Sequence, residues 1–157
     1  MLMHDHTLLR QAWVYLELLD EFDTVSSIRG RRSFMKTILV IDDEDDLRAM
    51  VVKALKAEGF ETIEADNGSS ALTLARNRHP DLIISDVIMD SGSGFMLQEL
   101  LREDPATASI PLILMSGHAK HVGAWQSDSA TEYLAKPFGL LELLASVARK
   151  LGPKSGS

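Results

Sequence analysis

The chain has 157 residues, enough for one domain with a short extension, and 45% of them are hydrophobic, which suffices for a sizeable core. Its net charge of −7 excludes an overall basic field that would hold nucleic acid, and the lack of cysteine excludes disulfides, thiolate metal sites and thiol catalysis. The lack of cysteine fits a reducing compartment, so we expect a cytoplasmic protein, and the net charge indicates no nucleic-acid partner. No stretch reaches the roughly 18 apolar residues of a membrane-spanning helix, so we expect no membrane partner either.

Residues 1–34 form the first predicted segment, an N-terminal amphipathic helix with a linker. The apolar residues at helical spacing are Leu9, Trp13, Leu16 and Leu19. They predict a helix over 7–23, followed by the serine, glycine and arginine stretch 24–33. Four interpretations stay open: a flexible appendage, a protein that truly starts at Met35, a helix packed on the domain, or a helix that pairs two copies into a homodimer.

Residues 35–151 are predicted to form the main domain, with a polar tail over 152–157. Apolar or alternating runs predict strands at 37–41, 60–65, 81–85, 111–116 and 132–135. Helical patterns lie between and after them, at 46–58, 67–80, 95–101 and 138–151. A fourth intervening helix is expected at 117–130, short or mobile because Gly123 and several polar residues disfavour it. Strands that alternate with helices indicate a doubly wound parallel sheet of α/β class.

Polar side chains gather where the predicted strands end. They are Asp42 and Asp43 after the first strand, Asp86 after the third, Ser116 after the fourth and Lys136 after the fifth. Ligands of doubly wound sheets bind outside the carboxyl ends of the strands. Three carboxylates beside one another suit a hard cation such as Mg²⁺, which lowers their mutual repulsion. A carboxylate held there can attack phosphorus, and Asp86 is the best placed nucleophile.

Four stretches together resemble the receiver domain of the response-regulator family of two-component signalling. They are "ILVIDDE", "PDLIISDVIM", "PLILMSGHA" and "YLAKPF", and the resemblance covers roughly residues 36–151. It implies a flavodoxin-like fold with a five-stranded parallel sheet of strand order 2-1-3-4-5. It also implies a phosphoacceptor that receives its phosphoryl group from a sensor histidine kinase or a phosphotransfer protein. Such a protein catalyses its own phosphorylation and dephosphorylation and is not an enzyme that acts on other substrates.

The resemblance also implies roles for single residues. Asp86 matches the phosphorylated aspartate, and Lys136, before a proline that is usually cis, matches the invariant lysine. The expected Mg²⁺ ligands are Asp42, Asp43, Asp86 and the backbone carbonyl of Ile88. Ser116 matches the switch hydroxyl and Tyr133 the aromatic switch residue. Ile88 and His118 lie two residues beyond Asp86 and Ser116, where side chains tune the loss of the phosphoryl group.

Two stretches depart from the family pattern. "MDSGSGF" replaces the common Met-Pro-x-Met-Asp-Gly turn, and Asp90 stands where proline is usual, so we expect a looser loop. "QSDSATEY" replaces the usual Ala-Gly-Ala before the last strand. Neither removes a catalytic group. A downstream target is expected to bind the surface formed by 117–130, 132–135 and 138–151. We expect no output domain in this chain, because only six residues follow Leu151. The alternative is that the chain is a fragment of a longer protein.

Two other functions compete with the receiver hypothesis. A haloacid-dehalogenase-like phosphohydrolase would need Asp-x-Asp-x-Thr after the first strand, and "DDEDDL" does not supply it. A phosphorylation-independent module of the same fold predicts the loss of a site residue, and none is lost. Glu44, Asp45 and Asp46 are interpreted as a solvated helix start, since acids favour the first helical turn.

Overall fold

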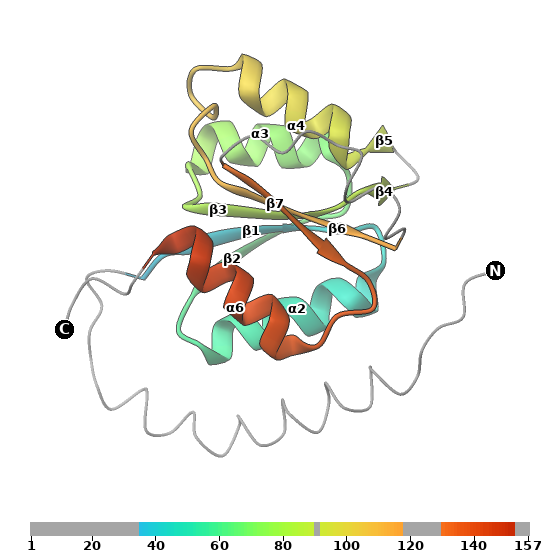
Figure 1. Ribbon diagram of the computed structural model, residues 1–157. Helices are drawn as coiled ribbons and strands as arrows, with labels where there is room; N and C mark the ends of the chain where they lie inside the picture. Colours follow the sequence, from blue (N-terminus) through green and yellow to red (C-terminus); the bar gives the residue numbers. More distant parts are fainter. Residues whose placement is uncertain (1–34, 90–91, 118–129, 153–157) are drawn as a thin grey trace.

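A single five-stranded parallel sheet organises the protein, as the computed structural model shows for residues 35–89, 92–117 and 130–152. Its strands are β1 (Thr37–Ile41), β2 (Glu61–Ala65), β3 (Leu82–Asp86), β6 (Leu112–Ser116) and β7 (Thr131–Ala135). They lie in the order β2-β1-β3-β6-β7 (Figure 1). This order confirms the predicted flavodoxin-like topology. The predicted N-terminal helix and the weak helical stretch after Gly117 lie outside the described residues.

The central strands are buried on both faces, which their sequences explain. Every residue of β3 and β6 is buried, and so is β1 from Ile38 onward. Runs of Ile, Leu and Val suit such strands because both faces must pack against helices. The register aligns the strand ends, with Ile41 beside Ser85 and Asp86 beside Met115. The side chains that follow these strands therefore meet at one edge.

Helices cover the two faces of the sheet in pairs (Figure 1). Helices α2 (Asp45–Ala57) and α6 (Leu140–Leu151) pack on one face, and α3 (Gly68–Arg78) and α4 (Gly94–Glu103) cover the other. Each face has its own core, centred on Val40, Leu55 and Leu143 on one side and on Leu39, Leu101 and Leu114 on the other. Among the described residues, no helix is long and apolar enough to cross a membrane.

The structure corrects several predicted boundaries and adds one element. Asp86 is the last residue of β3 rather than the first one after it, because it still pairs with Met115. β7 begins at Thr131 and α6 only at Leu140. A two-stranded antiparallel hairpin, β4 (Ile88–Met89) with β5 (Gly92–Ser93), flanks the loop that we expected to be loose. The Lys136–Pro137 peptide is cis.

Gly94 packs tightly behind the end of β3. Its N–H donates to the carbonyl of Val87 at 2.8 Å. A Cβ at this position would lie 2.6 Å from the carbonyl oxygen of Asp86 and 3.1 Å from the side chain of Leu114. Backbone atoms at that distance cannot yield without moving the strand end, so the first residue of α4 must lack a side chain.

We predict that Gly94→Ala destabilises the protein by about 1–3 kcal/mol, the usual effect of forcing an extra carbon into a packed site. Urea unfolding measures the change. The matched control is Gly68→Ala at the first position of α3, where nothing lies within 4 Å of the added carbon. Equal effects of the two substitutions would contradict the close packing at Gly94.

Candidate functional site

Three aspartates converge at the carboxyl edge of the sheet. Asp42, Asp43 and Asp86 each offer a carboxylate oxygen, and these oxygens lie within 4.8 Å of one another. Asp42 is fully buried, Asp86 is 8% exposed, and Asp43 is half-buried. The cluster thus places two nearly buried carboxylates beside a third that faces the solvent.

The backbone of Asp42 is held from two sides. Its N–H donates to the carbonyl of Ala65 in β2, which extends the β1–β2 ladder by one residue. The guanidinium of Arg48 donates to its carbonyl at 2.6 Å, while also pairing with Asp45 at 2.7 Å and Glu64 at 3.2 Å. Sequence analysis missed Arg48, because an arginine in the first turns of a helix looks like an ordinary surface residue.

The carboxylate of Asp42 is only partly compensated. Its Oδ1 accepts a hydrogen bond from the N–H of Glu44 at 2.9 Å, whereas its Oδ2 is buried and has no hydrogen-bond partner. Burial raises the pKa of Asp42 to about 6, and the carboxylates of Asp86 and Asp43 add to the rise, against the opposing effects of the Glu44 N–H and Lys136. A buried carboxylate oxygen without a hydrogen-bond partner is chemically suited to bind a cation.

Lys136 supplies the cationic side of the site. Its Nζ lies 3.0 Å from Oδ2 of Asp86. The lysine is positioned by the backbone, since its N–H donates to the carbonyl of Ser116 at the end of the neighbouring strand. The other oxygen of Asp86, Oδ1, accepts from the N–H of Ile88 at 3.3 Å. Both oxygens of Asp86 therefore have donors, in contrast to Oδ2 of Asp42.

The remaining predicted residues surround this centre. Ser116 is buried as the last residue of β6, beside Ala135 in the register. Tyr133 in β7 is half-buried and contacts Phe95 of α4, with ring centroids 6.3 Å apart. The side chain of Ile88 is 59% exposed two residues beyond Asp86. His118 lies outside the described residues.

The acidic run after β1 divides into two groups. Asp42 and Asp43 belong to the cluster, while Glu44, Asp45 and Asp46 are exposed at the start of α2. Glu44 is the residue before the helix, and the two aspartates lie in its first turn, where negative charge is favourable. The expectation of a solvated helix start for these three residues agrees with their exposure.

The donor set fits a hard divalent cation. All three clustered side chains offer oxygen, one of them an unpartnered buried oxygen, and no thiolate or described histidine belongs to the group. Oxygen ligands and a solvent-facing side suit Mg²⁺, which keeps part of its water shell. The residues present are thus chemically compatible with the magnesium site that the sequence predicts.

Comparison with known proteins gives a consistent result. The family model for the response regulator receiver domain matches residues 38–148. The chain is 37% identical over 123 residues to the phosphate regulon transcriptional regulatory protein PhoB of Pseudomonas aeruginosa, covering 75% of this chain and 54% of that protein. The chain therefore spans about half the length of this relative.

Solved structures show the same likeness. The chemotaxis response regulator CheY4 of Vibrio cholerae superimposes with a TM-score of 0.67 at 30% identity, covering 75% of this chain and all of that one. The receiver domain from the hybrid histidine kinase CckA superimposes with a TM-score of 0.63 at 30% identity, covering 74% of this chain and 99% of that one. With the family model matching well over half of its residues, the chain belongs to the receiver-domain family of two-component response regulators.

Proposed function

We propose that this chain accepts a phosphoryl group on Asp86 from the phosphohistidine of a sensor histidine kinase or a phosphotransfer protein. One observation carries the proposal: the Asp86 carboxylate lies both in the aspartate cluster and 3.0 Å from the ammonium of Lys136. A nucleophilic carboxylate next to cationic groups is what phosphoryl transfer requires, because negative charge accumulates on the equatorial phosphoryl oxygens.

The transfer exchanges one bond for another. A carboxylate oxygen of Asp86 forms a bond to phosphorus while the phosphorus–nitrogen bond of the phosphohistidine breaks, and the imidazole leaves with the electron pair. Bound Mg²⁺, with Asp42, Asp43, Asp86 and the Ile88 carbonyl as proposed ligands, would neutralise charge on the phosphoryl oxygens. The Ile88 N–H holds Oδ1 of Asp86, so the carboxylate is already oriented in the free protein.

Lys136 and Ser116 are the proposed groups that respond to the new charge. The Lys136 ammonium now bonds to Oδ2 of Asp86, and phosphorylation would give it phosphoryl oxygens to bind instead. Ser116 lies on the neighbouring strand, and its hydroxyl would donate to the same group. Movement of Ser116 would be passed to Tyr133, whose ring contacts Phe95.

The surface that reads out the switch is proposed to lie around β7 and α6, together with residues 117–130. Leu141 at the start of α6 is 69% exposed, which leaves an apolar contact for a downstream protein or a second copy.

Loss of the phosphoryl group is proposed to occur by attack of water on phosphorus, with the side chains of Ile88 and His118 controlling how easily water reaches it. The proposed location is the cytoplasm, because the kinase that donates the phosphoryl group uses ATP. The proposed receiver unit is 35–151, between the extension 1–34 and the tail 152–157.

We predict that incubation with acetyl phosphate and Mg²⁺ adds one phosphoryl group, observable by intact-mass spectrometry and labile to hydroxylamine as an acyl phosphate should be. The adduct should disappear with EDTA and in Asp86→Asn, which keeps the shape of the side chain and removes the nucleophile. The matched control is Asp81→Asn, at an exposed aspartate before β3. An adduct of unchanged yield in Asp86→Asn would contradict the proposal, and steady donor hydrolysis without any adduct would favour a phosphohydrolase.

We further predict opposite effects of Lys136→Met on metal binding and on phosphorylation. Removal of the ammonium leaves the aspartates with more uncompensated charge, so Mg²⁺ should bind more tightly in calorimetric titration. At saturating Mg²⁺ the rate of phosphorylation should fall by roughly 10²-fold or more, the usual effect of losing one preorganised donor to a transition state. Lys56→Met, remote from the cluster, serves as the control. Weaker Mg²⁺ binding in Lys136→Met would disprove the assigned role.

A further inference from the structure

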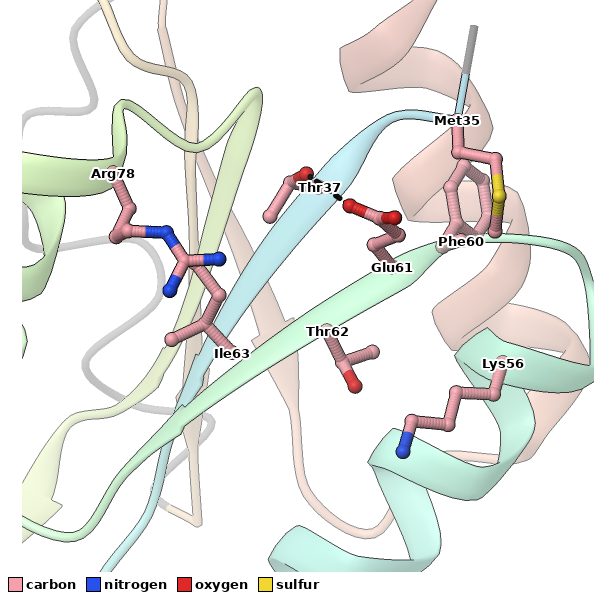
Figure 2. A pocket seen from close by; sticks show the side chains of 8 residues that line it. All are labelled: Met35, Thr37, Lys56, Phe60, Glu61, Thr62, Ile63 and Arg78. Carbon is pink, nitrogen blue, oxygen red and sulfur yellow. Dashed lines mark hydrogen bonds between the residues drawn. The ribbon is translucent and has the colours of Figure 1, made fainter. Parts of the chain in front are cut away.

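A second feature of the molecule lies at the opposite end of the sheet. An open cleft of about 450 Å³ runs beside the edge strand β2, near the beginnings of β1 and β2 (Figure 2). The functional site lies beyond the carboxyl ends of the strands, so the cleft is separate from it. The receiver mechanism uses none of the residues that line it.

The cleft combines apolar surface with two cations. Met35, which is 46% exposed, Phe60 and Ile63 supply the apolar surface. Lys56 at the end of α2 and Arg78 at the end of α3 extend from opposite sides of β2 (Figure 2). Within the described part of the chain, no acidic side chain forms an ion pair with either cation. The acid of the cleft, Glu61, accepts a hydrogen bond from Thr37.

The edge strand itself needs a cover. β2 pairs with β1 on one side, and no described strand pairs with its other side. Folded proteins usually protect such an edge with charged side chains, a helix or a loop, because unpaired N–H and C=O groups invite association with other chains. Lys56 and Arg78 provide part of this protection, but Met35 beside the edge remains exposed and Phe60 and Ile63 are only partly buried.

The chain itself offers a complementary segment, and it is attached at the cleft. Residues 1–34 join the domain at Met35, which lines the cleft. The sequence pattern of 7–23 predicts an amphipathic helix with an apolar stripe that includes Trp13 and Leu16. The acidic residues toward its end are Glu17, Asp20, Glu21 and Asp23. Apolar side chains and carboxylates complement the apolar residues and the two cations that line the cleft.

The length of the connection favours docking within one chain. The linker that the sequence predicts over 24–33 would have an average reach of ~18 Å, enough to bring 7–23 back to a surface that begins at its own attachment point. Short flexible tethers give effective concentrations on the order of a millimolar, so even a weak contact is populated. A second copy would need a comparable protein concentration to compete.

We therefore propose that residues 7–23 pack in cis on the cleft beside β2, with the apolar stripe on Met35, Phe60 and Ile63 and the acidic end facing Lys56 and Arg78. This packing covers the free edge of the sheet and leaves the aspartate cluster accessible. It does not depend on the proposed phosphoacceptor function.

Paramagnetic relaxation in the full chain tests the proposal. The chain has no cysteine, so Asn77→Cys, exposed beside Arg78, takes a single nitroxide label near the cleft. We expect the label to reduce the amide signals of 7–23 strongly, while a label on Glu142→Cys in α6 should not. The Lys56→Glu, Arg78→Glu double variant should restore these signals, and a further exchange of Glu17, Asp20 and Glu21 for lysine should reduce them again.

The controls separate the proposal from its competitors. In a mixture, one protein carries the nitroxide but no ¹⁵N, and the other carries ¹⁵N but no nitroxide. The amide signals of 7–23 in the ¹⁵N protein should then stay unchanged, because the contact is within one chain. Amide shifts of β3 and β6 should stay the same in every variant, which shows that the domain is folded. The proposal would be overturned if the signals of 7–23 stay reduced in the Lys56→Glu, Arg78→Glu variant, or if the label on Glu142→Cys reduces them equally. Relaxation between chains in the mixture would instead assign the cleft to a second copy.

Discussion

The repulsion among carboxylates at the carboxyl edge of the sheet is the constraint around which the site is built. A parallel sheet brings the ends of β1 and β3 together, and the chain places an aspartate at each end. One of these, Asp42, is fully buried with an oxygen that has no partner, and its pKa is raised to about 6. A buried ionised carboxylate is unfavourable unless a cation or hydrogen bonds compensate it.

The surrounding structure supplies only part of that compensation. Lys136 pairs with Asp86, and Arg48 binds the backbone of Asp42 rather than its carboxylate. Gly94 lets α4 approach the strand end closely, which fixes the backbone of Asp86 and Val87. The protein thus holds its acidic groups close together through backbone and side-chain contacts, in an arrangement that a bound cation or phosphoryl group would stabilise. Sites of this kind commonly lower stability in exchange for function.

Much of this organisation could be predicted from the sequence. Continuous apolar runs such as "TILVI" identify strands buried on both faces, and the parallel topology then brings their ends to one edge. The Asn67-Gly68 pair also marks a helix start, where the Asn67 side chain accepts from the N–H of Ser70. These features are local or follow from topology, so the candidate site residues could be named before their distances were known.

Other features depend on tertiary contacts that no local pattern encodes. Arg48 reaches Asp42 and Glu64 only because β2 lies next to β1, and the Phe95–Tyr133 contact joins α4 to β7. The β4–β5 hairpin is two residues long on each side, too short for an alternating pattern to appear. The cleft beside β2 likewise requires the ends of two helices to be placed in space, and sequence analysis gave no sign of it.

Asp42 is a buried charge that the protein compensates only in part and that a cation would relieve. Thermal or urea unfolding at pH 8 with and without Mg²⁺ measures this most directly. At that pH, above the raised pKa of Asp42, the folded protein carries the penalty of the buried charge. Asp42→Asn should therefore be more stable than the parent without metal, by on the order of 2 kcal/mol, and should gain little from Mg²⁺, whereas the parent should gain substantially. An Asp42→Asn protein that is less stable without metal, or that gains as much from Mg²⁺ as the parent, would contradict the account.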